Sequence, residues 1–556
     1  MVAGTPDSGF RAAKRGGLST SDLLLGAGGA YLLSVPLLWL LAGSSGASAW
    51  PMALVWGLSV LVNAPHYGAT LLRVYGQRAE RRKYALFAVW ATGLLLGLFW
   101  LGVHDAWVGS ALVTAYFSWS PWHFAAQNFG IALLFLRRQG VAVTPATRRL
   151  LQASFALSVL LTLLALNAES SNSLPAPTRG GQVPNIDLLR IGIPSDIAAA
   201  SILASLLAYL LCLAGAGWRL YREAPPQCLL PVGALVLCQA FWFTLPSLAL
   251  LGGAFDTRSL AFTAIWISAA HSAQYLWVTH HFARQSGEPR RLPAYFGRAT
   301  LVGNAAFVIP AFLCAPALLG GDLSFDGGLS ALVFSLVNLQ HFVLDGAVWK
   351  LRDGAVTRFL LRGEPAVGPT RPRSAGTSVP LRVMWVVFSL CLVLEAGELF
   401  RQYVQRLGNA QLTGQLLDAL SWAGREHEIA RIRLGRDLLE QGDYATARRH
   451  FARAADAQPS RAAWGGLGRA LEGLGDLPAA AQAYEAGLAV DPADAALLRS
   501  SGFVHRQLGD LETARKRLAQ ALQLEPRHAR THRALRDLQR SDEGLPSGKS
   551  DPQRKN

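Results

Sequence analysis

Hydrophobic residues are concentrated in runs of about 20 residues that continue to roughly position 400 of the 556-residue chain. A helix of that length crosses the hydrocarbon core of a bilayer. After about position 410 the composition becomes rich in Ala, Leu and Arg, with the polarity of an ordinary soluble protein. The pattern predicts an all-α protein in which a polytopic transmembrane helical bundle precedes a soluble helical tail.

We expect about eleven membrane spans. The run 108–136 is long for one crossing, so we expect it to be tilted or to break near Pro121. The predicted spans are 22–42, 50–72, 84–103, 108–136, 150–167, 196–217, 228–252, 259–282, 299–318, 328–349 and 381–400.

The net charge of +16 lies largely in short loops between these spans. Loops 73–83, 137–149, 284–298 and 350–382 are basic, whereas the intervening loops 43–49 and 320–327 contain no Lys or Arg. Because cytoplasmic loops carry the excess of Lys and Arg, the pattern predicts a cytoplasmic N-terminus. An odd number of spans then puts the tail in the periplasm of a bacterial inner-membrane protein. The charge thus indicates the lipid bilayer as a partner and no nucleic acid.

One sequence pattern occurs three times in the tail, at intervals of 33 and 34 residues. Each copy has a Gly-Asp turn, at Gly442, Gly475 and Gly509, followed by small residues at helical spacing and a proline. The pattern resembles the tetratricopeptide repeat. This resemblance implies a concave helical surface that binds a peptide or partner protein. In an alternative that stays open, the repeats dimerise the protein or pack on its own loops.

The predicted organisation therefore has five parts. A linker helix joins the membrane region to the repeats, and a capping helix follows the last repeat. The parts are a cytoplasmic N-terminal segment 1–21, a multi-pass transmembrane domain 22–400, a linker helix 401–427, a repeat domain 428–540 (repeats 428–460, 461–494 and 495–528, cap 529–540) and a disordered tail 541–556.

Four predicted spans each carry polar side chains along one helix face. Their central residues are His66 in "NAPHYGATLLR", His123 in "SPWHFAAQNFG", His271 in "AAHSAQYLWVTHH" and His341 in "NLQHFVLD". All four spans run from outside to inside in the predicted orientation. At about 1.5 Å per residue, the four histidines lie very roughly 10–20 Å from the cytoplasmic flank. They therefore meet at one level if the four helices are neighbours.

Polar side chains inside a membrane cost free energy unless they pair with one another or with a ligand. Several neutral imidazoles with one carboxylate suit non-haem iron or a similar divalent metal. We therefore expect His66, His123, His271, His341 and Asp345 as candidate metal ligands. Asp345 has two other possible roles, which are to hold His341 in one tautomer or to pair with Arg73. The residues expected to orient ligands or substrate are Asn63, Thr70, Arg73, Gln127, Asn128, Gln274, His280, His281 and Asn338.

Several of these segments resemble a known family. "PHYGAT" at 65–70 and "WHF" at 122–124 are similar to motifs of the bacterial carotene-cleaving dioxygenases related to the bacteriorhodopsin-associated protein. The segments that begin at His271 and Leu339 look loosely like downstream histidine motifs of that family. The resemblance implies a polytopic iron enzyme and supports the same four histidines as ligands. The chain departs from the family pattern at Thr70, where the family has an acidic residue, and in the repeat tail.

Three other interpretations stay open. Histidines at equal depth on facing helices can also ligate haem. An envelope glycosyltransferase with a repeat tail would use Arg179 or Arg190 in the long loop 168–195, but loop 43–49 lacks the carboxylates that such enzymes generally need. A non-enzymatic membrane scaffold, or a transport-associated protein, would use the repeats alone, with the polar stripes serving helix packing or transport. Our main hypothesis is a metal-dependent oxidase or oxygenase of a lipid or isoprenoid substrate whose repeats recruit protein partners.

Overall fold

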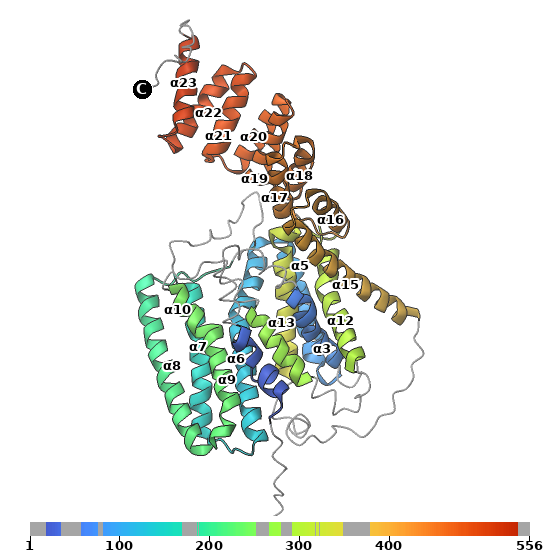
Figure 1. The fold of residues 1–556 in the computed structure, drawn as a ribbon, viewed down its shortest axis with the longest axis vertical. Coiled ribbons are helices and arrows are strands. Elements are labelled where there is room, and N and C mark those ends of the chain that lie inside the picture. The colour runs from blue at the N-terminus through green and yellow to red at the C-terminus, as the bar shows by residue number, and fades with distance from the viewer. Residues whose placement is uncertain are drawn as a thin grey trace, which may run out of the picture. The chain divides into compact units, whose positions relative to one another are not determined.

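The computed structural model describes residues 18–34, 57–75, 82–168, 186, 188–251, 266–279, 292–316, 318–321, 323–348 and 379–542. Every regular element of this part of the chain is helical (Figure 1). Contacts divide the chain into two compact units. We call them the membrane unit (1–178, 186–310 and 331–402) and the repeat unit (179–185, 311–330 and 403–556). The predicted segment 1–21 before Leu18 and the predicted tail after Asp542 lie outside the described residues.

The helices up to α15 form the membrane unit or enter it, except η7, which lies in the segment 311–330 of the repeat unit. Among them, α7 packs against α8 and α10, and α10 continues α9 through η5 (Figure 1). The bounds are η1 (Asp22–Gly26), η2 (Ser59–Asn63), α3 (Ala64–Tyr75), η3 (Leu86–Ala91), α5 (Thr92–His104), α6 (Ala106–Arg138), α7 (Pro145–Asn167), α8 (Ser195–Glu223), η4 (Pro226–Cys228), α9 (Leu230–Gln239), η5 (Ala240–Thr244), α10 (Leu245–Leu251), α12 (Leu292–Leu313), η7 (Phe325–Leu329), α13 (Ser330–Val348) and α15 (Val379–Arg406). Residues 266–279 are also helical.

Seven helical stretches of the described residues are long and apolar enough to cross a membrane, so membrane insertion is supported. They coincide with seven of the predicted spans. The stretches are Leu86–His104, Pro145–Asn167, Ser195–Glu223, Leu230–Leu248, Pro293–Leu313, Phe325–Val348 and Val379–Arg406. The total of eleven stays a prediction, because the expected spans 22–42, 50–72 and 259–282 extend beyond the described residues.

Helix α6 occupies the remaining predicted span, 108–136, and is long enough but not apolar enough to be among the seven. It runs unbroken through Pro121 over 33 residues, so the expected break at the proline is absent. Its polar residues, including His123, Gln127 and Asn128, lower its hydropathy. Helix α6, which is too polar to be among the seven apolar stretches, is thus one of the helices that carry a polar stripe.

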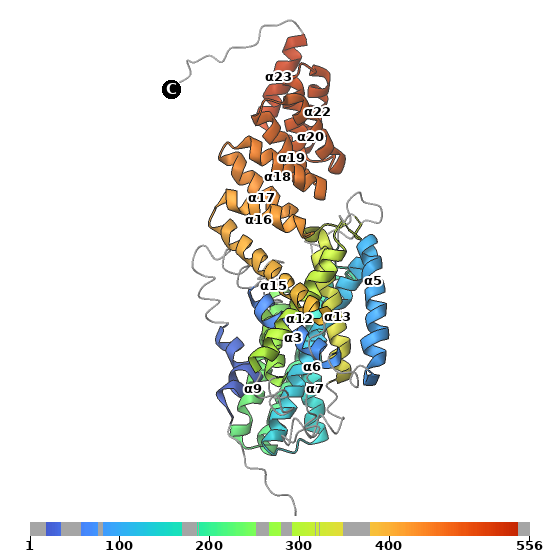
Figure 2. The same cartoon turned by 90° about the vertical axis from the view of Figure 1, so that its right-hand side faces the viewer.

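The repeat unit stacks its helices in chain order (Figures 1 and 2). Helix pairs begin at residues 428, 461 and 495, and a further helix begins at 529. The bounds are α16 (Ala410–Trp422), α17 (Glu428–Glu440), α18 (Tyr444–Ala457), α19 (Arg461–Gly473), α20 (Leu477–Val490), α21 (Ala495–Gln507), α22 (Leu511–Leu524) and α23 (Ala529–Asp542).

The repeated Gly-Asp turn has a physical cause at each of its two positions. Gly475 has φ of +80°, which costs glycine little because it has no Cβ, and the equivalent glycines of the other two turns have φ of +80° and +84°. The next residue, Asp476, accepts a hydrogen bond from the backbone N–H of Ala479 and so caps helix α20. The dipeptide therefore ends the first helix of each pair and begins the second.

Small residues allow the two helices of each pair to approach closely. A Cβ added to Gly468 would lie 2.5 Å from a ring carbon of Tyr484, which is far inside van der Waals contact. The equivalent glycines, Gly435 and Gly502, face Phe451 and Leu518 in the same manner. A large side chain on the second helix thus fills the space that the glycine of the first helix leaves.

The segment 311–330 belongs to the repeat unit, although it includes the end of the predicted span 299–318 and the start of the predicted span 328–349. The Ser324 hydroxyl donates a hydrogen bond of 3.1 Å to the side-chain carbonyl of Gln458. Asp326 Oδ1 lies 3.0 Å from Nδ1 of His427. Next to this pair, burial and the carboxylate of Asp326 raise the pKa of Glu428 to about 7. The connection between the ninth and tenth predicted spans is therefore tied to the first repeat.

We predict that Gly468→Ala destabilises the repeat unit by about 1–2 kcal/mol, because overpacking against Tyr484 outweighs the gain of helix propensity. Urea unfolding and hydrogen exchange of peptides from residues 428–542 measure the change. Gln482→Ala, at an exposed position of α20, is the matched control and should shift stability by less than about 0.5 kcal/mol. Equal stability of Gly468→Ala and wild type would contradict the packing described here.

We also predict that the repeat unit loses stability as the pH rises from about 4.5 to 7. In that range the folded state holds the Glu428 proton and the unfolded state has lost it, so unfolding becomes easier with rising pH. Above about pH 7 both states are ionised and this dependence levels off. Glu428→Gln should flatten the fall, measured by hydrogen exchange of residues 428–457 against pH. The same slope in wild type and variant would refute the assignment to Glu428.

Candidate metal centre

Four helical segments bring the four predicted histidines together in the membrane unit. His66 comes from α3, His123 from α6, His271 from the helical segment 266–279 and His341 from α13. The ring centroid of His66 lies 4.2 Å from that of His341 and 5.0 Å from that of His271. The His123 ring is 5.0 Å from His271 and 5.3 Å from His341. The convergence expected from the stripes is therefore observed.

The Nε2 atoms of all four histidines are buried and have no hydrogen-bond partner. Two of the opposite ring nitrogens are held, since the Ser272 hydroxyl lies 3.0 Å from Nδ1 of His66 and the Thr70 hydroxyl 3.2 Å from Nδ1 of His341. Both ring nitrogens of His271 lack a partner. Metal-binding histidines show this division, in which one nitrogen is oriented by a neighbour and the other carries the free lone pair.

Asp345 lies at the edge of the histidine cluster. Its Oδ2 is 3.2 Å from Nε2 of His341 and 4.0 Å from Nε2 of His123. Its Oδ1 accepts hydrogen bonds from the hydroxyls of Tyr275 (2.9 Å) and Thr70 (3.2 Å). Two groups of three side chains bring their ligand atoms within 4.8 Å of one another, and His341 belongs to both: His66, His271 and His341, and His123, His341 and Asp345.

The Thr70 hydroxyl lies within hydrogen-bond distance of three groups of the site. It donates to Oδ1 of Asp345 (3.2 Å) and lies 3.2 Å from Nδ1 of His341 and 2.6 Å from the Tyr275 hydroxyl. The same threonine stands where the resembling family has an acidic residue, and here it links the histidine to a carboxylate.

The predicted amides lie around the cluster but have different partners. Gln127 donates to the backbone carbonyl of His271 and to the side-chain carbonyl of Gln274. Asn338 accepts from the Tyr67 hydroxyl. Asn128 instead donates to Gln239, and this pair joins helices α6 and α9.

Four more predicted residues complete this set. The side chain of Asn63 is buried and its amide atoms have no hydrogen-bond partner. Arg73 follows Thr70 by three residues on α3. His280 and His281 lie outside the described residues.

Close packing of α3 against α12 holds His66 in place. A Cβ on Gly68 would lie 1.8 Å from the carbonyl oxygen of Ala299, and one on Gly303 would lie 1.7 Å from that of Ala64. Such contact between small residues is how membrane helices approach closely. The π-helix η2, which ends at Asn63, precedes α3 directly, and such wide turns are frequent at functional sites.

Two polar residues of the site, Ser272 and Tyr275, are not among the residues predicted from the sequence. Their spacing of three residues on one helix was the signal that both face the cluster. The hydroxyls of both contact candidate ligands, Ser272 at His66 and Tyr275 at Asp345.

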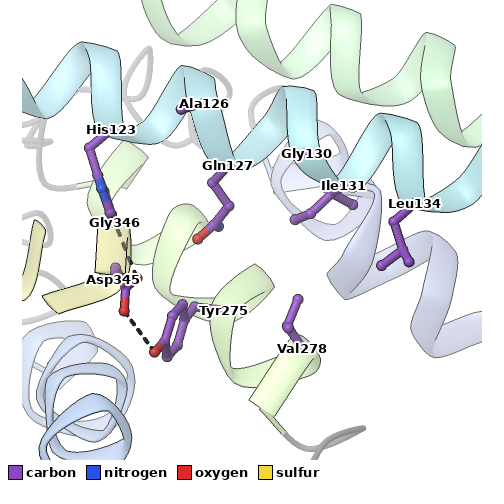
Figure 3. Close-up of a pocket in the computed structure, with 10 residues that line it drawn as sticks. All are labelled: His123, Ala126, Gln127, Gly130, Ile131, Leu134, Tyr275, Val278, Asp345 and Gly346. Atoms are coloured by element: carbon purple, nitrogen blue, oxygen red, sulfur yellow. Dashed lines mark hydrogen bonds and ion pairs between the residues drawn. The ribbon is translucent and has the colours of Figure 1, made fainter. Parts of the chain in front are cut away.

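An apolar groove of about 230 Å³ begins at this cluster. His123, Asp345 and Tyr275 line one end, and Leu134 and Val278 line the other (Figure 3). The predicted centre therefore adjoins a space that a hydrophobic molecule can enter.

The comparisons with known proteins concern the repeat unit. Residues 432–495 match the family model of the tetratricopeptide repeat. Together with the helix pairs, this match identifies a C-terminal tetratricopeptide domain, a class of module that generally mediates protein–protein interaction. A search of curated proteins found no match to the chain. The resemblance of the histidine segments to carotene-cleaving dioxygenases thus stays a prediction.

Proposed function

We propose that the membrane unit is a metal-dependent oxidase or oxygenase of a hydrophobic substrate, with non-haem iron held by His66, His123, His271 and His341. The observation that carries this proposal is the convergence of four buried Nε2 atoms without a hydrogen-bond partner. Each such atom costs about 1–3 kcal/mol when it is left unsatisfied. A divalent ion at either group of three ligand atoms would offset this cost for the histidines of that group, and a set of neutral nitrogens with one carboxylate suits iron.

The packing of the rings supports a bare ion over haem. Neighbouring imidazole centroids in the cluster are 4.2–5.3 Å apart. Two histidines that ligate haem from opposite sides must leave room for the porphyrin plane between their rings. Rings this close, on four different helical segments, leave room for a single ion.

When bound, the iron would supply one-electron chemistry toward dioxygen. The residues of the chain would do the rest. Thr70 orients His341 through Nδ1, and Ser272 orients His66. Asp345 accepts hydrogen bonds from Tyr275 and Thr70, which hold its carboxylate beside His341. The apolar groove beside His123 would admit an apolar substrate.

The repeat domain would recruit a protein partner on the periplasmic side of a bacterial inner membrane. Its tie to segment 311–330 supports this side, because that segment includes the loop 320–327, which is free of Lys and Arg. A second candidate function, a membrane scaffold without enzymatic activity, is favoured by the family match of the repeats alone. For the glycosyltransferase alternative, Arg179 lies outside the described residues, and Arg190 is only partly buried.

We predict that detergent-purified protein contains about one iron per chain and shows no Soret band. His341→Ala should lose the metal, because His341 belongs to both candidate ligand groups. Thr70→Val keeps every ligand and should weaken metal affinity about 10–100-fold by freeing the His341 ring. Elemental analysis and absorption spectra measure both effects.

His104→Ala is the matched control for the metal prediction, since His104 ends α5 and is exposed. It should keep the full metal content. Folded wild-type protein that binds neither metal nor haem under metal-replete conditions would overturn the enzyme proposal and favour the scaffold.

We further predict that deletion of 425–540 abolishes partner capture and leaves the metal content unchanged. The histidines belong to one compact unit and the repeats to the other. Crosslinking in the native membrane, followed by mass spectrometry, compares the deletion with wild type and with His341→Ala. Partner capture that survives the deletion would contradict the role given to the repeats.

A further inference from the structure

The groove beside the histidine cluster follows one face of helix α6. Its lining residues on that helix are His123, Ala126, Gln127, Gly130, Ile131 and Leu134, which follow the i, i+3, i+4, i+7, i+8, i+11 pattern of one helix face and so form one stripe. From His123 to Leu134 the helix rises by about 16 Å. Figure 3 shows this stripe running away from Asp345 and Tyr275 toward Leu134 and Val278. The space is therefore long and narrow.

The two ends of the groove differ in chemistry. The end at His123 and Asp345 is polar and belongs to the candidate metal centre. Beyond Gln127 the lining of α6 has only aliphatic side chains and a glycine, and Val278 faces it from the segment 266–279. A ligand that lies along the groove therefore has an uncharged, apolar body with one part next to the polar end.

The side wall of the groove is open at two glycines. A Cβ added at Gly130 or at Gly346 would have no atom within 4 Å. Ala126 and Gly346 are exposed, whereas Ile131 and Leu134 are only 4% and 5% exposed. The groove thus opens sideways near the polar end and is closed deeper along α6. In a membrane protein, a lateral opening between apolar helices gives access from the lipid phase.

From this geometry we infer that the groove takes a long, slender, uncharged hydrocarbon chain that enters from the bilayer past Gly130 and Gly346. The absence of a side chain at these two positions selects the ligand by width, since any larger residue would occupy the path. Both a fatty-acyl chain and an isoprenoid chain have this chemistry. The inference rests on the proposed function only for the reaction of the hydrocarbon chain at the polar end of the groove.

The test uses full-length protein in phosphatidylcholine vesicles that carry a photoreactive chain, either a hexadecyl chain or a linear isoprenoid chain with a diazirine. Because Ile131 and Leu134 are buried, labelling there requires a chain inside the groove. Exposed Leu94 on α5 reports contact with ordinary surrounding lipid. We expect labelling of Ile131 and Leu134 in wild type, and the probe that labels more strongly identifies the source of the chain.

Gly130→Leu should lower the labelling of Ile131 and Leu134 about tenfold, the change expected when about two methylene groups lose their burial. Labelling of Leu94 should not change. Gly97→Leu is the matched control, because Gly97 lies on membrane helix α5 and also has open space around it. This variant should label as wild type does.

The outcomes separate this inference from the metal proposal. Equal labelling of Ile131 and Leu134 in wild type and Gly130→Leu would contradict the proposed binding of a chain in the groove. The absence of labelling in wild type with either probe would contradict it as well. Metal content is measured on the same samples. Groove labelling in protein that binds no metal would instead overturn the enzyme proposal and leave the chain-binding groove standing.

Discussion

Hydrogen-bonding groups inside a membrane must find partners, because lipid offers none. The membrane unit mostly meets this requirement, for example through the link from Asn128 through Gln239 to Ser158, which crosses three helices. The histidine cluster concentrates the groups that do not meet it, since the Nε2 atoms of His66, His123, His271 and His341 are buried without a hydrogen-bond partner. Of these four atoms, those of His341 and His123 lie 3.2 Å and 4.0 Å from Oδ2 of Asp345.

The contacts that hold the histidine cluster in place differ from one helix to the next. Contact between glycines and backbone holds α3 close to α12, whereas the hydroxyls of Ser272 and Thr70 hold individual rings. Asp345 connects two of the histidines to Tyr275 at the mouth of the groove. The contacts of the histidine cluster and the lining of the groove thus share the same few residues.

The repeat unit has a simpler physical basis. A glycine on the first helix of each pair faces a large side chain on the second, and an aspartate caps the second helix. The unit also includes segment 311–330, through Ser324 and Asp326.

Local patterns were sufficient for part of this description. Apolar runs predicted the seven candidate spans, and the recurrence of Gly-Asp turns predicted the repeat helices, because both depend on neighbours in the sequence. The spacing of Asn338, His341 and Asp345 placed them on one face of α13 for the same reason. The meeting of His66, His123, His271 and His341 depended on which helices are neighbours, and only tertiary packing decided that. The orientation of single ring nitrogens, the role of Ser272 and the open groove beside Gly130 were likewise decided by contacts between residues that lie far apart in the chain.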